Sequence, residues 1–193
     1  MNIIYENVSL SDLFIDEREL WARLGGIGTV SDEKIKSAAD EISAAATAAY
    51  AVKNLSVTVN NGSCICAGEL TIAGESFAKI AGGCPTIMVI AATLGSGVDR
   101  LIRKKSAISI AEGFVYDAVA SAMIESLVNL ATVRNTSGKE HTNRFSPGYA
   151  DMPLELQGEI ISLLEAGKRM GITLGDSKLM SPSKTVTAFV GIK

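Results

Sequence analysis

The stretch whose residue types best suit ligand chemistry is residues 144–153, RFSPGYADMP, which joins two predicted helices. Arg144 carries a planar guanidinium that matches a carboxylate, and Tyr149 offers a hydroxyl group and a ring face for a cation. Two prolines stiffen the chain here, and Gly148 permits a close approach of the backbone to a ligand. The segment therefore predicts a site for a zwitterionic ligand with a positive centre. The alternative is a stiff helix connection in which Arg144 caps a helix and Tyr149 packs inward.

Helices on both sides are expected to hold this segment. The preceding one, Ala107–Thr132, is rich in alanine and apolar on most sides, which is typical of a buried helix. The following one, Leu154–Met170, has its apolar residues close to one stripe. Further helices are expected at Ile15–Leu24, from an N-cap at Ser31 to about Val52, at Glu75–Ile80 and at about Val98–Lys105.

The pattern of the remaining segments indicates an antiparallel sheet. Pro85–Ala92 is continuously apolar and rich in Ile and Val, as in a strand that is buried on both faces. Asn60-Asn61-Gly62 is a hairpin-turn signal. Because hairpins replace a regular βαβ alternation, we predict an α+β fold with a mixed, largely antiparallel sheet packed with helices. The other expected strands are Met1–Leu10, Leu55–Val59, Ser63–Ala67, Glu69–Ile72 and Thr185–Ile192.

The composition predicts one globular domain. The chain has 193 residues, of which 47% are hydrophobic and 20% charged, so it can bury a sizeable core. We expect a single domain over residues 1–193. Its N-terminal helical segment would span residues 1–54, and residues 55–193 would hold the sheet, the other helices and the ligand motif.

Charge and hydropathy argue against several classes of function. The net charge is -3, and the densest basic run, Arg100–Lys105, is more typical of a solvated helix face than of a nucleic-acid site. No segment is apolar for long enough to predict a membrane span, and Glu6 interrupts any resemblance to a signal peptide. Three cysteines argue against a disulfide framework. We expect a cytoplasmic protein with no nucleic-acid or membrane partner.

Other local signals favour structural roles. His141 is the only histidine, which argues against a histidine-rich metal site and a Ser-His-Asp triad. Cys64, Cys66 and Cys84 leave a three-thiolate zinc site open, but their spacing matches no common zinc motif and buried free cysteines are common. We therefore predict no metal site. Gly95-Ser96-Gly97 is either a phosphate-binding helix start or a tight turn, and a lone Gly-x-Gly favours the turn.

Four residues of the segment at 144–153 also resemble a known signature. Arg144, Gly148, Tyr149 and Pro153 match, in type and spacing, the S-adenosylmethionine-binding motif of the activation domain of cobalamin-dependent methionine synthase. Downstream, the order of a helix, Gly-aliphatic-x-Leu, acidic-Ser, Met-x-Pro and Thr-Val-Thr is similar to that family as well. The resemblance covers about residues 107–192, and the first hundred residues resemble small stand-alone relatives more loosely.

The resemblance implies a set of ligand contacts around this motif. In that family the arginine holds the carboxylate of the ligand, which falls here to Arg144. The backbone atoms that follow contact the ligand, which implies Phe145 and Ser146, together with Gly148 and Tyr149.

The family also uses acidic residues from elsewhere in the domain. The position of its acidic residue on the long helix falls on Ser121, and Asp117 and Glu125 lie one turn before and after it on the same face. Either could replace the missing carboxylate, unless both simply face solvent or cap neighbouring groups. Asp12 and Asp16 are the nearest counterparts of the family's N-terminal aspartate.

The function implied by the resemblance is reductive reactivation of a cobalamin-dependent methionine synthase in methionine biosynthesis. The chain would bind S-adenosylmethionine and offer its methyl group to the corrinoid of the partner, while a flavodoxin-type reductant supplies an electron. Cobalamin would enter only through the partner, because Lys139 and Arg144 stand where a corrinoid-binding module has Asp and Gly around its histidine. The chain would then be a component of a methyltransferase system, without a catalytic residue of its own.

Two other functions stay open from the sequence. A corrinoid-protein interaction module that has lost S-adenosylmethionine binding is favoured by Ser121 and by the absence, before Lys193, of the aromatic segment with which the family helps to hold the ligand. If the ligand is still bound, that pocket would be altered or completed by another protein. An independent methyltransferase would need a glycine-rich Rossmann loop, and the sequence has none.

Overall fold

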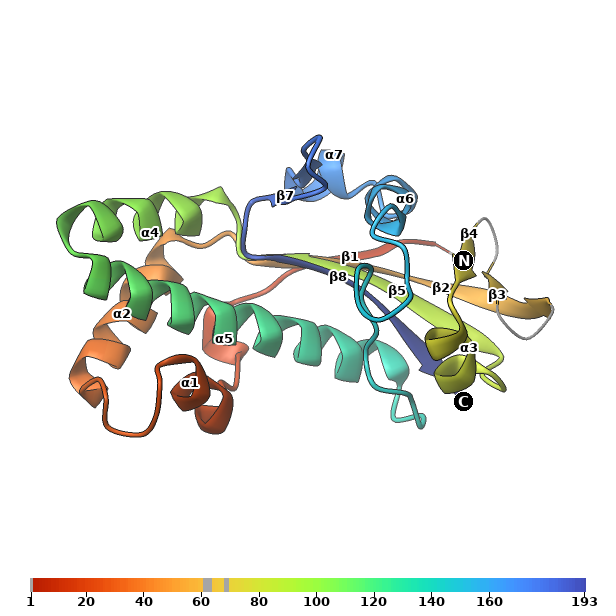
Figure 1. Ribbon diagram of the computed structural model, residues 1–193, viewed down its shortest axis with the longest axis horizontal. Helices are drawn as coiled ribbons and strands as arrows, with labels where there is room; N and C mark the ends of the chain where they lie inside the picture. The colour runs from red at the N-terminus through yellow and green to blue at the C-terminus, as the bar shows by residue number, and fades with distance from the viewer. Residues whose placement is uncertain (1, 61–63, 68–69) are drawn as a thin grey trace.

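The structure is a computed structural model that describes residues 2–60, 64–67 and 70–193, with only the backbone at 59–60 and 64–66. Two helical layers enclose a central sheet, with α5 below it and α6 and α7 above it in Figure 1. The helices are α1 (Glu17–Arg23), α2 (Asp32–Ala45), α3 (Glu75–Ala81), α4 (Ser96–Ile108), α5 (Ile110–Thr136), α6 (Leu156–Leu163) and α7 (Ala166–Met170).

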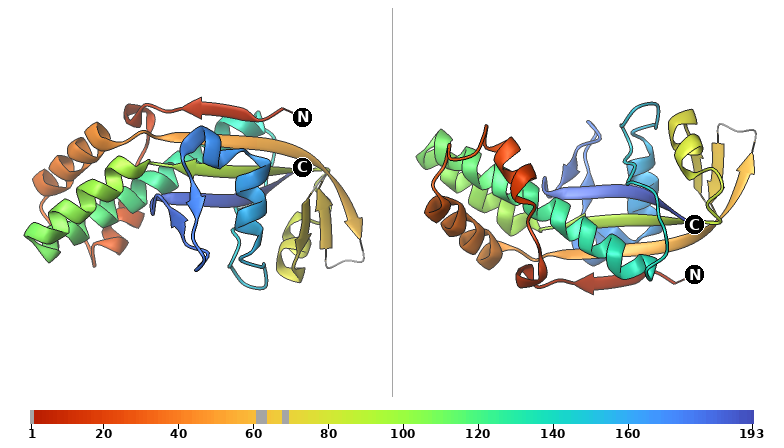
Figure 2. Two further views of the ribbon diagram at one scale, coloured as in Figure 1. Left: turned by 90° about the horizontal axis from the view of Figure 1, so that it is seen from above. Right: turned by 90° about the horizontal axis from the view of Figure 1, so that it is seen from below.

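The sheet is antiparallel throughout the described residues. Its strands follow the order β4-β3-β2-β5-β8, and β1 pairs with the first part of the long strand β2. This arrangement confirms the predicted α+β class, and Figure 2 shows the strands fanning out between the helices. The strands are β1 (Ile4–Asn7), β2 (Ala49–Asn60), β3 (Cys64–Ala67), β4 (Leu70–Ala73), β5 (Thr86–Thr93), β6 (Thr173–Leu174), β7 (Met180–Ser181) and β8 (Thr185–Ile192).

Two hydrophobic cores lie on opposite faces of the sheet, and β5 contributes to both. Because side chains alternate along a strand, Met88 and Ile90 do not share a face with Val89. The first two pack in the core that contains α5, whereas Val89 packs with Phe77 of α3 and Ile160 of α6. The prediction of a strand that is buried on both faces is therefore confirmed.

Helix α5 is the central helix of the fold. Ser109 caps its start, because its hydroxyl accepts a hydrogen bond from the Glu112 N–H at 3.4 Å. It ends at Thr136, and the following Ser137 caps it in a left-handed conformation with φ of 54°. By length and composition alone α5 could cross a membrane, contrary to the expectation that no segment reaches that length. However, 67% of its most apolar stretch is buried inside the protein.

The second helix is shorter than the sequence predicts. The alanine-rich run favours a helix to about Val52, but α2 ends at Ala45 and the chain enters β2 at Ala49. There Ala49–Val52 pairs with β1 on one side and β5 on the other. Sheet pairing and the burial of Tyr50 and Val52 against α5 override the helix propensity of alanine.

The helix predicted at Leu154–Met170 is two helices. Glu165 has a φ of 50°, which breaks the helical hydrogen-bond pattern between α6 and α7. The small hairpin of β6 and β7 follows, with Leu174 opposite Met180. The turn predicted at Asn60-Asn61-Gly62 lies largely outside the described residues, although β2 and β3 do pair across it, with Asn60 opposite Cys64.

The Gly95-Ser96-Gly97 segment is a tight, packed turn. Gly95 has a φ of 85°, and a Cβ atom there would lie 2.1 Å from the Thr47 hydroxyl oxygen. A Cβ atom at Gly97 would lie 2.0 Å from the Ala45 carbonyl oxygen. The start of α4 is therefore packed against the end of α2, which agrees with the predicted tight turn.

Candidate functional site

The segment at residues 144–153 forms a compact bend on the surface beside β8. The Gly148 N–H donates to the Met152 carbonyl at 3.0 Å, and the Tyr149 N–H donates to the Ser146 carbonyl at 3.1 Å. Gly148 has a φ of 84°, and a Cβ atom there would lie 2.8 Å from Leu154 Cδ1. The bend therefore requires glycine at this position for both its backbone conformation and its space.

The bend begins where strand pairing stops. Phe145 and Phe189 exchange two backbone hydrogen bonds, of 3.0 and 2.8 Å, as an antiparallel bridge at the outer edge of β8. Continuing that register would place Pro147 opposite Thr187, and proline has no N–H to donate. The chain consequently leaves the edge of the sheet at Pro147.

Two side chains anchor the bend to the rest of the fold. The Phe145 ring is buried and lies 5.6 Å from the Phe77 ring, centroid to centroid. The Asp151 carboxylate accepts hydrogen bonds from the Ser76 N–H at the start of α3, at 3.3 Å. Hydrogen bonds from Ser76 lower the pKa of Asp151. The Phe145 side chain is therefore part of the hydrophobic core. Only the Phe145 backbone remains available for the ligand contact that the resemblance implies.

Arg144 and Glu125, which were both predicted to contact the ligand, form an ion pair. Arg144 Nη2 lies 2.6 Å from Glu125 Oε2, and Nη1 donates to the Glu125 carbonyl at 3.4 Å. Both side chains are about three-quarters buried, with 24% and 28% exposed. Arg144 therefore reaches the face of α5 instead of entering the core. Within the described part of the chain, the Arg144 Nε donates no hydrogen bond.

Tyr149 is presented to solvent. It is 68% exposed, and its ring packs edge-on against Phe145 with centroids 5.3 Å apart and an interplanar angle of 78°. One ring edge is therefore fixed by Phe145, while much of the Tyr149 side chain remains accessible. The alternative of an inward-packed tyrosine is thereby excluded.

The other two residues predicted on α5 are held by a lysine that the sequence analysis missed. Lys184 Nζ lies 2.7 Å from Asp117 Oδ1 and donates to the Ser121 hydroxyl at 2.9 Å. The Ser121 hydroxyl in turn donates to the Asp117 carbonyl at 2.8 Å. Asp117 remains 56% exposed, whereas the Lys184 side chain is 12% exposed. The Lys184 amine thus lies beside Ser121, the position to which the resemblance assigns an acidic residue.

Lys184 is positioned by contacts between segments that are far apart in the sequence, so no local pattern predicts its position. It comes directly before β8, and the preceding Ser183 donates through its N–H and hydroxyl to Asp99 of α4, at 2.8 and 2.7 Å. The three elements α4, α5 and β8 therefore converge on one row of charged groups along α5. In order, the row consists of Asp117 with Lys184, Ser121, and Glu125 with Arg144.

The N-terminal aspartates lie elsewhere. Asp12 Oδ2 is 3.3 Å from Arg134 Nη2, and Arg134 lies nine residues after Glu125, which places it on the opposite face of α5. Asp16 caps α1 by accepting from the Arg18 N–H at 2.8 Å. Neither residue joins the row.

The remaining candidate ligands of the sequence analysis do not assemble into a site. Among the described residues, no cluster of His, Cys, Asp and Glu could hold a metal ion. The side chains of Cys64 and Cys66 lie outside the described residues. Cys84 is buried as a free thiol, and burial raises its pKa. His141 is exposed and pairs through its backbone with Ile192 of β8.

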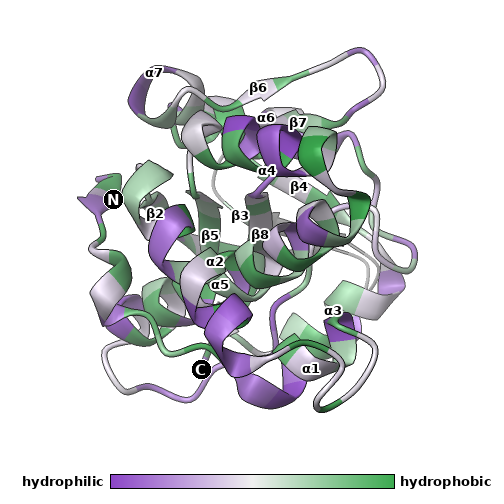
Figure 3. Ribbon diagram, turned by 90° about the vertical axis from the view of Figure 1, so that its left-hand side faces the viewer, coloured by the Kyte–Doolittle hydropathy of each residue, from purple (hydrophilic) through white to green (hydrophobic). Residues whose placement is uncertain are grey.

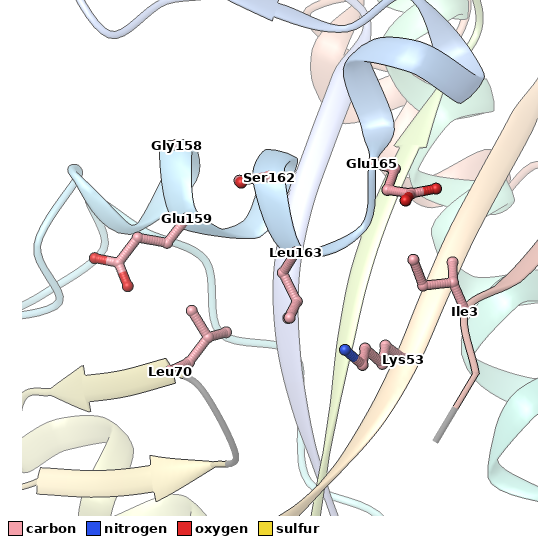
Figure 4. A pocket seen from close by; sticks show the side chains of 8 residues that line it. All are labelled: Ile3, Lys53, Leu70, Gly158, Glu159, Ser162, Leu163 and Glu165. Carbon is pink, nitrogen blue, oxygen red and sulfur yellow. The ribbon is translucent and has the colours of Figure 1, made fainter.

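A separate cavity lies on the other side of the sheet from α5. It has a volume of about 540 Å³ and opens between α6 and the middle of β2. Figure 4 shows the Lys53 amine in this cavity, with Leu163 pointing toward it from the helical side and the Glu159 and Glu165 carboxylates directed to either side. None of the predicted site residues lines it, so the sequence-based site and this cavity are distinct.

The fold has a counterpart among solved structures. A crystal structure of the MetH reactivation domain bound to AdoHcy aligns with a TM-score of 0.76 and 16% sequence identity, covering 100% of this chain and 78% of that chain. No protein-family model matches the chain, and a search of curated proteins finds no match. The likeness at this identity concerns the architecture, and the chain has the fold of the MetH reactivation domain.

Proposed function

We propose that this chain binds S-adenosylmethionine on the bend at residues 144–153 and presents its methyl group to the corrinoid of a methionine synthase. The observation that carries the proposal is the placement of Arg144 and Tyr149. On a reactivation-domain fold, the bend holds the Arg144 guanidinium against α5 and exposes Tyr149 five residues further along the chain. The AdoHcy in the structural neighbour is the product that remains when S-adenosylmethionine gives up its methyl group, which supports a ligand of this class.

The charges of the row suit the charges of the ligand. S-adenosylmethionine carries a carboxylate, an ammonium and a sulfonium group. The Nε edge of Arg144 would hold the carboxylate, because Nη1 and Nη2 already contact Glu125. Glu125 and the exposed Asp117 carboxylate would attract the ammonium group. The accessible ring of Tyr149 would face the sulfonium, whose positive charge favours an aromatic surface.

The role of the protein in the transfer is positioning. The partner's corrinoid, once reduced with one electron from a flavodoxin-type reductant, would supply the electron pair that accepts the methyl group, and the neutral thioether would remain on this chain. Arg144 and Glu125 would hold the amino-acid end of the ligand so that the methyl group points outward, which converts a loose encounter into an oriented one. The chain then acts as a component of a methyltransferase system in the cytoplasm.

A second function is favoured by one observation. Lys184 occupies the place beside Ser121 where the resemblance calls for an acid, and Glu125 already engages Arg144. A corrinoid-protein interaction module that no longer binds S-adenosylmethionine would accommodate both facts. The two functions differ in whether binding to the corrinoid protein is accompanied by methyl transfer.

The test is a methyl-transfer assay. The full chain is mixed with a corrinoid-loaded methionine synthase fragment that lacks its own reactivation domain, a flavodoxin-type reductant and S-adenosylmethionine labelled in its methyl group. We expect label on the corrinoid and one equivalent of AdoHcy, both dependent on the chain. Complex formation without label transfer and without S-adenosylmethionine binding would overturn the proposal in favour of the interaction module.

A further inference from the structure

Two exposed apolar side chains continue the charged row towards the start of α5. Ile110 is 87% exposed and Phe114 is 52% exposed. Their spacing to Asp117, Ser121 and Glu125 is four, three, four and four residues, which places all five side chains on one face of the helix. The proposed ligand site and this apolar surface are therefore parts of a single face.

The flank of this surface is basic, although the chain as a whole carries a net charge of -3. Arg103 of α4 lies one turn after Asp99, so it projects on the side of α4 from which Asp99 reaches Ser183 beside the row. Arg103 and its neighbour Lys104 are exposed, and neither has a carboxylate within ion-pair distance in the described part of the chain. Figure 3 looks onto this end of the molecule, where hydrophilic and hydrophobic ribbon segments lie close together.

The same surface borders a large cleft. Ile110 and Phe114 line a hollow of about 1040 Å³ between α2 and the start of α5. The wall of this hollow includes Glu41, which accepts hydrogen bonds from Lys105 Nζ at 2.8 Å and from the Tyr116 hydroxyl at 2.6 Å. Lys105 Nζ also lies 4.5 Å from the centroid of the Tyr116 ring, so the ion pair and the ring together form part of the wall between α2 and α5.

We propose that Arg103, Ile110 and Phe114 form a docking face for a partner protein whose contact surface has an apolar depression flanked by carboxylates. The inference rests on the proposed function and names the surface through which the carrier of the methyl acceptor is engaged. The ligand proposed beside Glu125 would lie on the same face of α5 as Ile110 and Phe114, so a carrier of the methyl acceptor that covers this face would contact both. Exposed aromatic and aliphatic anchors next to uncompensated basic groups match an apolar centre with an acidic rim.

A protein fits this surface better than a lipid bilayer. A helix that lies in a membrane interface buries a continuous apolar face, whereas α5 carries Asp117, Ser121 and Glu125 on the same face, about two to four turns from Ile110. If Ile110 and Phe114 inserted deeply into a bilayer, these polar groups would also enter the apolar medium, and their transfer costs free energy. A protein surface can instead pair each group separately.

The test compares charged substitutions inside and outside the docking face. The double variant Ile110→Asp and Phe114→Asp places two carboxylates in the expected apolar depression, and its matched control is Val133→Asp, which alters a 66% exposed side chain near the other end of α5. Binding to the corrinoid-loaded methionine synthase of the same organism is measured by surface plasmon resonance. We expect the double variant to weaken binding about thirtyfold and Val133→Asp to leave it unchanged.

A charge reversal tests the flank separately. Arg103→Glu should slow association about tenfold at low ionic strength and much less at high salt, because exposed charges steer encounter and are screened. The control Lys168→Glu, on the exposed part of α7, should not slow it. Each variant is also titrated with S-adenosylmethionine. Unchanged ligand affinity together with weakened docking supports the docking face.

The outcomes separate this inference from the proposed function. If no chain binds S-adenosylmethionine but the double variant alone loses the partner, the proposed function fails and the docking face stands. If the double variant binds the partner as the unmodified chain does, if Val133→Asp weakens binding equally, or if the unmodified chain does not bind the partner, the docking face is refuted. Binding to phosphatidylserine vesicles that the double variant loses, without any loss of the protein partner, would also refute it.

Discussion

Replacing Arg144 by glutamine should weaken S-adenosylmethionine binding strongly while leaving the fold intact. Glutamine is shorter and neutral, so it cannot offer the two parallel N–H groups that a guanidinium presents to a carboxylate. Because the Arg144 side chain lies against α5 and belongs to neither hydrophobic core, its replacement leaves the Phe145 and Asp151 anchors in place. The substitution therefore reports on the ligand rather than on folding.

The magnitude follows from the surroundings of the guanidinium. Hydrogen bonds to charged groups contribute about 1.5–3 kcal/mol each, and the 24% exposure of the Arg144 side chain places it towards the lower end. A loss of about 2 kcal/mol corresponds to about thirtyfold in the dissociation constant. Glu125, once freed from Arg144, would also repel the ligand's carboxylate, which acts in the same direction.

Isothermal titration with S-adenosylmethionine measures the effect, and the chain contains a matched control. Arg169→Gln breaks an ion pair of the same 2.6 Å length with Glu165, on α7 and outside the row. We expect Arg169→Gln to bind like the unmodified chain. The reasoning would be refuted if Arg144→Gln changed the dissociation constant by less than about twofold, where about 1.4 kcal/mol corresponds to tenfold. It would also be refuted if both substitutions had the same effect.

Three further substitutions test the bend, the helical end and the row. Gly148→Ala should lower the free energy of unfolding by about 1–2 kcal/mol in urea titrations, because the residue has a φ of 84° and its new methyl group would meet Leu154; equal stability would contradict this. Hydrogen bonding from Lys105 lowers the pKa of Glu41 below its ordinary value of 4.5. Its stabilising effect is therefore complete above that value and lost as the pH falls, so acid should destabilise the unmodified chain more steeply than Glu41→Gln; parallel acid-denaturation curves would contradict this. Lys184→Met should tighten S-adenosylmethionine binding about threefold at low ionic strength, because it exposes a carboxylate of α5 to the ligand's positive groups, and salt should erase the gain; weaker binding in the titration would instead assign the amine a contact with the ligand.

The sequence was informative where local pattern and tertiary environment agree. The continuous apolar run of β5 predicts a strand buried on both faces, and the structure confirms it. The Asn and Gly signals and the lack of βαβ alternation predict the antiparallel sheet. Helical periodicity places Asp117, Ser121 and Glu125 on one face, and all three indeed carry the contacts of the row.

The misjudged elements are those whose conformation is decided by distant partners. The alanines at 48–51 favour a helix locally, but they lie between two strands in the sheet, where a small side chain also fits. The left-handed backbone conformation at Glu165 could not be predicted, because the residue is not a glycine. In both cases packing overrides propensity.

The candidate site was predictable in part. Arg144 and Glu125 are 19 residues apart, yet the motif and the helix face together predict that they share a site. Lys184 could not be found in this way, because its partner Asp117 is 67 residues away in sequence and no spacing rule links the last strand to α5. The pairing depends on how β8 and the Ser183 turn dock beside α4, which is a property of the assembled fold.

A crystal structure of the chain grown with S-adenosylmethionine tests the central claim most directly. We predict ligand density on the bend, with the carboxylate about 3 Å from the Nε edge of Arg144, the ammonium group towards Glu125 and the methyl group directed to solvent. Density in the cavity beside Lys53, or an unliganded bend at saturating concentration, would contradict the account.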